Sequence, residues 1–261
     1  MFSDNELKLF NQIFTEFGLR IDGRKNLEIR GHSFTPNVIP NCAASLKLQY
    51  NNNQNSIIFA VKSEIVVNEN NSIENNNLIV LDINTMQNSK NNQIASYLIN
   101  ILNKLLINNI NTETLYIENS NKKLYWKLYL DVCIYDDLRL SLLQLISLGI
   151  NKVFENLHLP KIVYFMNQIT KEEDYDLLSK YNDSLKKDNY EMKIDLKLPN
   201  IYVFSVLGNN LIIDPEDEEL AIGRCTIFIS AMNHEIINIE GVGDEVDPIL
   251  YVQLHDFIKN L

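Results

Sequence analysis

The sequence predicts an α+β protein with two halves, in each of which helices cover one face of a β-sheet. Three observations support this prediction. Residues 124–135 alternate between apolar and polar side chains, as a half-buried strand does. Residues 138–157 are apolar around most of a helical cylinder, which indicates a helix packed on more than one side. The second half of the chain is largely composed of strand patterns and ends in an amphipathic helix.

Length and charge limit the classes of function. The 261 residues, 46 % of them hydrophobic, are enough for one large domain or two tightly joined halves with a sizeable core. A net charge of -11 disfavours a protein that grips nucleic acid on its own, because phosphate contacts need a positive surface. The three cysteines are far apart and form no CxxC motif, so we expect neither a disulfide framework nor a zinc site. The chain has no signal peptide pattern and no apolar run of membrane-spanning length, and we expect it to stay inside the cell.

The first 29 residues predict a helix followed by a basic loop. Ser3 and Glu6 fit a capping box, and Gly18 ends the helix. Residues 18–24 place two arginines on either side of an Asp-Gly pair, which is typical of a surface turn. The helix carries an apolar stripe that needs a partner surface: Leu7, Phe10, Phe14 and Phe17.

Residues 30–168 predict the first subdomain. Residues 41–50, 56–67 and 78–83 have strand patterns, and we expect them to form an antiparallel meander. Residues 93–107 predict an amphipathic helix. Short strands are expected at residues 115–118 and 162–166, and the Asn-rich tracts at 68–77 and 88–92 have the composition of loop expansions.

A charged, weakly patterned stretch at residues 169–189 predicts a linker to the second subdomain, residues 190–261. There, Asp247 as N-cap and Pro248 at the first helical position begin a final helix. This helix is expected to bury Leu250, Leu254, Phe257 and Leu261. Strands are expected at residues 193–198, 201–207, 211–214, 225–231 and 235–240.

Two groups of side chains bear on metal chemistry. The carboxylates of Asp214, Glu216, Asp217, Glu218 and Glu219 are dense enough to hold a hard cation such as Mg²⁺. Because Asp214-Pro215 ends a strand, the favoured interpretation is that these acids cap a turn or short helix. The four histidines show no paired spacing, so no metal site is predicted from them.

The turn after the central strand is the third candidate for chemistry. A strand that runs into a helix places backbone N–H groups outward, where anions bind. Residues 135–139 offer no glycine for close backbone approach, and Asp136 and Asp137 repel a phosphate. Arg139 could restore a weak attraction or extend into solvent. This turn therefore does not predict a phosphate site.

An ordered set of stretches over nearly the whole chain resembles the RNase PH-like subunits of the eukaryotic RNA exosome. The Val-Lys-Ser-Glu strand end at residues 61–64 and the Asp-Pro-x-x-Glu-Glu stretch at residues 214–219 most resemble the descendants of the archaeal non-catalytic ring subunit. The full set comprises residues 19–24 with Arg30, residues 59–64, residues 126–132, Leu159-Pro160, and residues 211–215 leading to Glu218-Glu219.

The resemblance implies an RNase PH-like fold and a place in a hexameric ring that is capped by RNA-binding proteins and threads RNA toward a separate nuclease. Active relatives carry a Gly-rich phosphate turn and an aspartate pair in the second half, and this chain is expected to lack both. The implied protein is a non-catalytic subunit that supports 3′→5′ RNA processing and degradation, in the nucleus, nucleolus and cytoplasm, with no cofactor and no metal. RNA contacts, where they occur, are expected at Arg20, Arg24, Arg30 and Arg139.

Two alternatives stay open. One is an active phosphate-dependent 3′→5′ exoribonuclease that uses Asp214, Asp217 and Mg²⁺. The other is a small-molecule kinase, which the absence of a Gly-Ser-rich phosphate loop disfavours.

Overall fold

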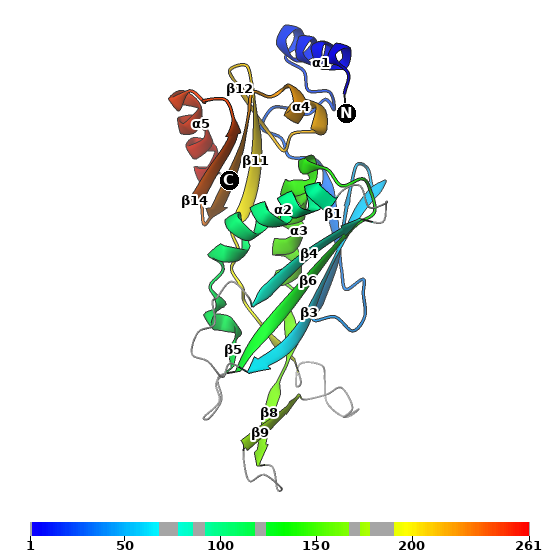
Figure 1. The fold of residues 1–261 in the computed structure, drawn as a ribbon, viewed down its shortest axis with the longest axis vertical. Helices are drawn as coiled ribbons and strands as arrows, with labels where there is room; N and C mark the ends of the chain where they lie inside the picture. Colours follow the sequence, from blue (N-terminus) through cyan, green and yellow to red (C-terminus); the bar gives the residue numbers. More distant parts are fainter. Residues whose placement is uncertain are drawn as a thin grey trace.

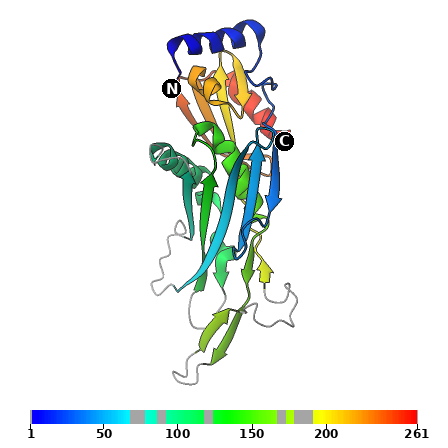
Figure 2. The same cartoon turned by 90° about the vertical axis from the view of Figure 1, so that its right-hand side faces the viewer.

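A computed structural model of the protein describes residues 2–67, 78–85, 92–117, 124–166, 173–177 and 191–260. The molecule is elongated, with a larger sheet in its middle, a smaller sheet toward the end that carries the N-terminus, and a hairpin at the opposite end (Figures 1 and 2). None of the helices in the described ranges is long and apolar enough to cross a membrane.

The larger sheet is built around β6 (Leu124–Ile134). Its side chains alternate strictly between buried and half-buried, which confirms the strand and the face predicted for it. The strand order is β1-β2-β3-β6-β4. The short strand β5 pairs with the first two residues of β6, Leu124 and Tyr125. The other members are β1 (His32–Pro36), β2 (Ala44–Tyr50), β3 (Asn55–Val67), β4 (Ile79–Thr85) and β5 (Tyr116–Ile117).

The expected antiparallel meander is wrong at its third strand. β4 does not pair with β3 but runs parallel to β6, with Leu81 opposite Leu130. The helix between these two strands explains the difference, because a strand–helix–strand connection is long enough to bring two strands together in parallel. A further strand, β1, was not predicted, since its sequence His-Ser-Phe-Thr-Pro has almost no apolar alternation.

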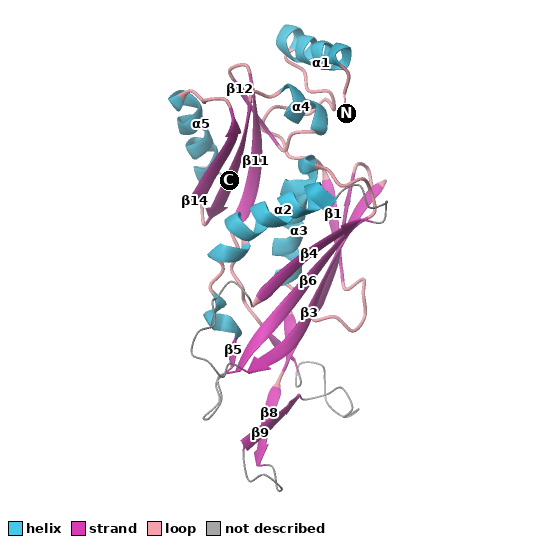
Figure 3. Ribbon diagram, viewed as in Figure 1, coloured by secondary structure: helices cyan, strands magenta, loops and turns pink. Residues whose placement is uncertain are grey.

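The central helix, α3 (Leu143–Phe154), lies between the two sheets. It contacts β2 and β3 of the larger sheet on one side and β11 of the smaller sheet on the other (Figure 3). Gln144 and Ser147 are polar but buried. Their side chains accept hydrogen bonds from the N–H groups of Val203 and Ile201, at 3.0 and 3.1 Å, which offsets the cost of removing them from water. Packing on two sides is therefore confirmed. The helix begins later than expected, after an extended segment and a 3₁₀ turn, η5 (Leu140–Leu142).

The smaller sheet is fully antiparallel, in the order β12-β11-β13-β14. The final helix, α5 (Pro248–Lys259), packs on one of its faces and buries Leu250 and Leu254, as predicted, together with Ile258. Leu261, expected to be buried, lies outside the described residues. The strands are β11 (Asn200–Leu207), β12 (Asn210–Ile213), β13 (Cys225–Met232) and β14 (Glu235–Gly243).

Two small sheets correct the interpretation of the middle of the chain. β8 (Ile162–Met166) pairs with β9 (Glu173–Leu177), so the range predicted as a linker contains a strand. β7 (His158–Pro160) pairs with β10 (Glu191–Lys193), and residues 194–198 are irregular where a strand was expected. The remaining helices are α1 (Asp4–Phe17), α2 (Asn92–Leu105), α4 (Asp217–Ile222), η3 (Ile107–Asn109) and η4 (Thr112–Leu115).

The N-terminal helix α1 has the predicted ends. Ser3 Oγ accepts from the Glu6 N–H, the Glu6 carboxylate accepts from the Ser3 N–H at 2.7 Å, and Gly18 ends the helix at φ 62°. Phe14 is buried against Leu207 and Ile212 of the smaller sheet. Phe17, expected on the same stripe, is 67 % exposed.

Candidate functional site

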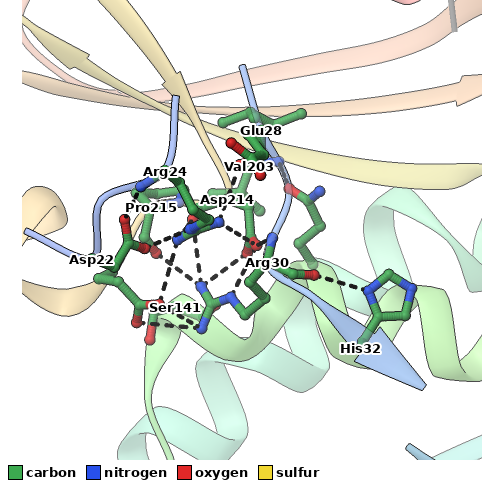
Figure 4. Close-up of polar contacts among 12 residues, drawn as sticks. Asp22, Arg24, Glu28, Arg30, His32, Ser141, Val203, Asp214 and Pro215 are labelled. Carbon is green, nitrogen blue, oxygen red and sulfur yellow. Dashed lines mark hydrogen bonds and ion pairs between the residues drawn. The ribbon is translucent and has the colours of Figure 1, made fainter. Parts of the chain in front are cut away.

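The loop after α1 brings three arginines against the junction of β12 and α4. Figure 4 shows two of them, Arg24 and Arg30, around Asp214. We call this group the arginine–carboxylate cluster, and it comprises Arg20, Arg24, Arg30, Asp214, Glu216 and Glu219. Ile213 N–H donates to the carbonyl of Asn26 at 2.9 Å, which holds the loop against β12. Asp214 ends the strand in a left-handed conformation at φ 49°, one that aspartate tolerates better than most residues.

Arg20 and Glu219 form the most buried ion pair of the cluster. Two guanidinium nitrogens of Arg20 donate to the two carboxylate oxygens of Glu219, at 2.8 and 2.7 Å. The other donors of Arg20 reach the main-chain carbonyls of Lys25, Glu28, Ile213 and Asp214 at 3.0 to 3.3 Å. Both side chains are almost fully buried. All directions in which this guanidinium can donate are thus taken up inside the protein.

Asp214 is enclosed by the other two arginines. Its Oδ2 accepts from the main-chain N–H and Nε of Arg30, at 2.8 and 2.9 Å, and from Nη1 of Arg24 at 3.0 Å. Its Oδ1 lies 2.8 Å from Nη2 of Arg30. The side chain of Asp214 is 0 % exposed. This carboxylate therefore faces two positive charges and no solvent.

Arg30 also joins the two halves of the molecule. Its Nη2 donates to the carbonyl of Ser141 in η5, at 3.1 Å, while its Nε holds Asp214 at the end of β12. Burial by itself would lower the pKa of the Arg30 guanidinium, but the charges of Asp214 and Glu216 outweigh it and raise this pKa. The arginine stays charged. Through its contacts with Ser141 and Asp214 it connects the N-terminal loop to the 3₁₀ turn before α3 and to the smaller sheet.

The acidic stretch after β12 begins a short helix, as its preferred interpretation predicted. Asp217, Glu218 and Glu219 occupy the first turn of α4, where carboxylates stabilise the positive end of the helix dipole. Glu219 also accepts from the Glu216 N–H at 2.9 Å. Burial raises the pKa of Glu216, and the opposing effect of Arg30 and Arg24 does not fully offset it.

The predicted RNA-binding arginines are placed very differently. Arg20 and Arg30 are buried and Arg24 is nearly so, and their guanidinium groups donate to acids of the cluster, to Asp22 and to main-chain carbonyls. The Arg139 side chain is 45 % exposed. Contact between RNA and any of the four stays a prediction, and burial disfavours it for Arg20 and Arg30.

The turn between β6 and η5 gathers carboxylates around Arg139. Nη2 of Arg139 lies 3.9 Å from carboxylate oxygens of both Asp136 and Asp137, and its Nε lies 3.6 Å from Asp217 in α4. Three acids thus surround one partly exposed guanidinium, which leaves the turn negative and unsuited to a phosphate. Within the described ranges, no group of three or more His, Cys, Asp or Glu side chains is arranged to hold a metal ion.

Asp136 is fixed by groups from three strands of the larger sheet, β2, β3 and β4. Its carboxylate accepts from Tyr50 Oη at 3.3 Å and from the side-chain amide of Asn55, and its carbonyl accepts from Thr85 Oγ1 at 3.1 Å. Burial, and then the Asp136 charge, raise the pKa of the Tyr50 phenol to about 12. The phenol stays protonated and donates to the turn at neutral pH.

This pKa gives a prediction for alkaline solution. An unfolded tyrosine loses its proton near pH 10, whereas Tyr50 in the folded protein holds it to about pH 12. Because the unfolded chain then binds fewer protons, the free energy of unfolding should fall as pH rises through this interval. Urea denaturation at pH 9.5 and pH 11 should show a smaller fall for Tyr50→Phe than for the wild-type chain. Equal falls would contradict the contribution of Tyr50.

No protein-family model matches the sequence. The fold, however, is that of solved exosome structures. A structure described as an archaeal exosome core matches with a TM-score of 0.68 and 19 % identity, over 98 % of this chain and 93 % of that one. A chain of the Archaeoglobus fulgidus exosome with RNA bound to the active site matches with a TM-score of 0.71 and 18 % identity, over 98 % and 94 %. Rice Rrp46 matches with a TM-score of 0.55 and 13 % identity, over 91 % and 92 %. The chain thus has the RNase PH-like fold of exosome core subunits.

The sequence adds a particular relative. Over 253 residues the chain is 23 % identical to Exosome complex component RRP42 of Saccharomyces cerevisiae, and the match covers 95 % of this chain and 84 % of that protein. The sequence and the fold are thus both similar to those of RNase PH-like subunits of the exosome core, the class of protein that the sequence stretches predicted.

Sequence reasoning identified the arginines and the carboxylates of the cluster but did not pair them. The separation of Arg20 and Glu219, 199 residues apart, leaves no local signal for their contact. Ser141 was missed because it contributes its main-chain carbonyl rather than its side chain. The Arg-x-Asp-Gly-Arg sequence, with an acid between two arginines, is a local signal that could have suggested ion pairs inside the protein, since a buried arginine needs acidic partners.

Proposed function

We propose that this protein is a non-catalytic structural subunit of the RNA exosome core ring that supports 3′→5′ RNA processing and degradation. The RNase PH-like fold and the likeness to RRP42 support the assignment to the exosome. The observation that supports the absence of catalysis is the state of Asp214, whose carboxylate is enclosed by Arg24 and Arg30.

A carboxylate can serve as a metal ligand or a general base only when it has oxygen lone pairs directed at a ligand or substrate. The Oδ2 atom of Asp214 already accepts three hydrogen bonds, and Arg30 lies against Oδ1. The neighbouring turn adds Asp136 and Asp137 where a phosphate nucleophile would need donors. Both features support a structural role over phosphate-dependent cleavage by Asp214, Asp217 and Mg²⁺.

The proposed partners are other RNase PH-like subunits in a hexameric ring and the RNA-binding proteins that cap it. Exposed apolar side chains on and after α1 support protein partners, since single domains seldom leave such residues close together: Leu9, Phe17, Leu19 and Ile21. Contact with RNA is proposed to be local, with Arg139 the best placed of the four predicted arginines. The expected locations are the nucleus, the nucleolus and the cytoplasm.

The test is an assay of phosphorolysis. The purified chain, alone and in a co-expressed complex, is incubated with single-stranded RNA, inorganic phosphate and Mg²⁺, and release of nucleoside diphosphates is measured. We expect none from the chain alone, and within the complex we expect Asp217→Asn in this chain to leave any activity unchanged. Asp217 is chosen because its side chain is partly exposed, so its amide variant should fold. Diphosphate release that Asp217→Asn abolishes would establish the exoribonuclease alternative.

A further inference from the structure

The helix α5 covers one face of the smaller sheet but leaves a pocket beside it (Figure 1). This pocket has a volume of about 200 Å³ and lies between α5, the loop after α1 and the turn that joins β11 to β12. Four side-chain amides and Leu27 stand at its rim, the amides being those of Asn26, Asn209, Asn210 and Gln253. Its floor is apolar and consists of Phe204, Leu211, Leu254 and Phe257.

A second pocket, of about 280 Å³, lies near the end of the same helix. The ring of Phe257 contacts Phe204 in the first pocket and Tyr202 in the second, with ring centroids 5.6 and 6.5 Å apart. Tyr202 and Phe204 are two residues apart on β11, which separates them by about 7 Å along the strand. The two pockets are therefore neighbours beside α5. The lining of the second comprises Asn200, Tyr202, Ala231, Asn233, His234 and Ile258.

The chemistry of the linings selects a neutral ligand. Neither lining contains a lysine, an arginine, an aspartate or a glutamate. A phosphate bound there would give up water without gaining a counter-charge, so RNA is an unsuitable ligand for these pockets. Side-chain amides both donate and accept hydrogen bonds, and the four at the first rim form none within the described part of the chain. They are available to the N–H and C=O groups of a peptide main chain.

The size of the pockets limits the length of the ligand. A water molecule occupies about 30 Å³ of liquid, so each pocket holds the volume of several waters, which is comparable with one large side chain. A contact between folded subunits buries well over ~1,000 Å² across a broad surface, whereas two adjacent pockets suit a short extended segment. In such a segment alternate side chains point the same way about 7 Å apart, as Tyr202 and Phe204 do.

We infer that the two pockets beside α5 bind a short extended peptide of a protein outside the ring. An apolar side chain of this peptide enters the first pocket, and a neutral hydrogen-bonding side chain two residues away enters the second. The rim amides hold the peptide main chain, Phe204 and Phe257 pack on the apolar side chain, and Tyr202 and Asn233 bond to the polar one. The inference goes beyond the proposed function and does not rest on it. Because no ion pair contributes, binding should depend little on salt.

The test uses two capped, fluorescein-labelled peptides, Ser-Leu-Ser-Gln-Ser and Ser-Gln-Ser-Leu-Ser, which present the two side chains in both directions. Fluorescence anisotropy measures their binding to the complex co-expressed with RNase PH-like companions and to the full chain alone. We expect at least one peptide to bind, and replacement of its leucine with serine to weaken binding at least about tenfold, because the apolar burial is lost. Absence of binding by both peptides, or equal affinity of the serine peptide, would overturn the inference.

Variants at exposed positions locate the bound peptide. Gln253→Trp fills the first pocket from its rim, and Val252→Trp, at an exposed position of the same helix outside both linings, is the matched control. We expect Gln253→Trp to weaken binding at least about tenfold and the control to bind like the wild-type chain. Leu27→Ser, which removes an apolar side chain of the rim without adding bulk, should also weaken binding. Thermal denaturation checks that all variants fold. Equal binding by Gln253→Trp and Val252→Trp would place the peptide elsewhere and overturn the inference.

Measurements on both the complex and the isolated chain separate an outside partner from a ring neighbour. If the chain alone binds the peptide and the assembled complex does not, a ring subunit covers the pockets and the inference is overturned. If the chain joins no companions, the proposed function fails, and the peptide measurement on the chain alone still decides the inference. A uridine oligonucleotide that displaces the peptide would replace the peptide with RNA as the ligand.

Discussion

Replacing Arg20 with methionine should lower the free energy of unfolding by about 3–5 kcal/mol, because it leaves a buried carboxylate without its counter-charge. Glu219 is almost fully buried, and both of its oxygens accept from Arg20 at 2.7 and 2.8 Å. Methionine also removes the donors to four main-chain carbonyls of the loop and of β12. Urea denaturation of the wild-type and variant chains measures the difference.

A second variant separates loss of the ion pair from loss of packing. Arg20→Met combined with Glu219→Leu removes both charges, so the double variant should lose less than the sum of the two single variants. Arg139→Met is the matched control, because this arginine is 45 % exposed and its carboxylate contacts are long, and it should change stability by less than about 1 kcal/mol. Equal effects of Arg20→Met and Arg139→Met would show that the buried pair contributes nothing particular.

Gly149→Ala should destabilise the protein by roughly 1–3 kcal/mol, the usual cost of overpacking a core. An alanine in the middle of a helix ordinarily stabilises it by up to about 1 kcal/mol relative to glycine, so the expected sign is reversed here. The reason is contact between α3 and β3: an added Cβ at Gly149 would lie 2.1 Å from the ring of Phe59, which is itself fully buried. Thermal and urea denaturation both measure the effect.

Gly31→Ala is the control, since a Cβ at Gly31 has nothing within 4 Å, and it should be close to neutral. Phe59→Leu combined with Gly149→Ala should recover part of the loss, because the smaller side chain vacates the space that the added methyl needs. A stabilised Gly149→Ala variant would mean that α3 can move away from β3 without cost.

The elements with a clear period were predictable, and their neighbours were not. The alternation of β6 and the three-to-four spacing of α3 report on burial that each segment experiences by itself. Nothing in residues 78–83 specifies that β4 runs parallel to β6, since pairing depends on the path of the connecting chain. The strand β9 lies in the range predicted as a linker, because its acidic residues Glu173, Asp174 and Asp176 have low strand propensity.

The candidate site shows the same limit. The acids after Asp214 were predicted to cap a short helix, because that signal is local, and α4 confirms it. The sequence predicts RNA contacts for the arginines of residues 20–30 because it shows the charge of these side chains but not the carboxylates that they contact in the folded protein. Only the folded chain places Asp214 and Glu219 beside them.

The distance along the chain within the arginine–carboxylate cluster has a consequence for biosynthesis. Arg20 leaves the ribosome early, but Glu219 follows it by 199 residues. At roughly 5–20 residues per second, the N-terminal segment waits on the order of 10–40 seconds for its carboxylates. During that interval the larger sheet can already collapse, while the arginines remain hydrated and the loop stays unanchored. Closure of the cluster is therefore a late event, and a nascent chain that stops before β12 leaves its first thirty residues open to proteases and chaperones.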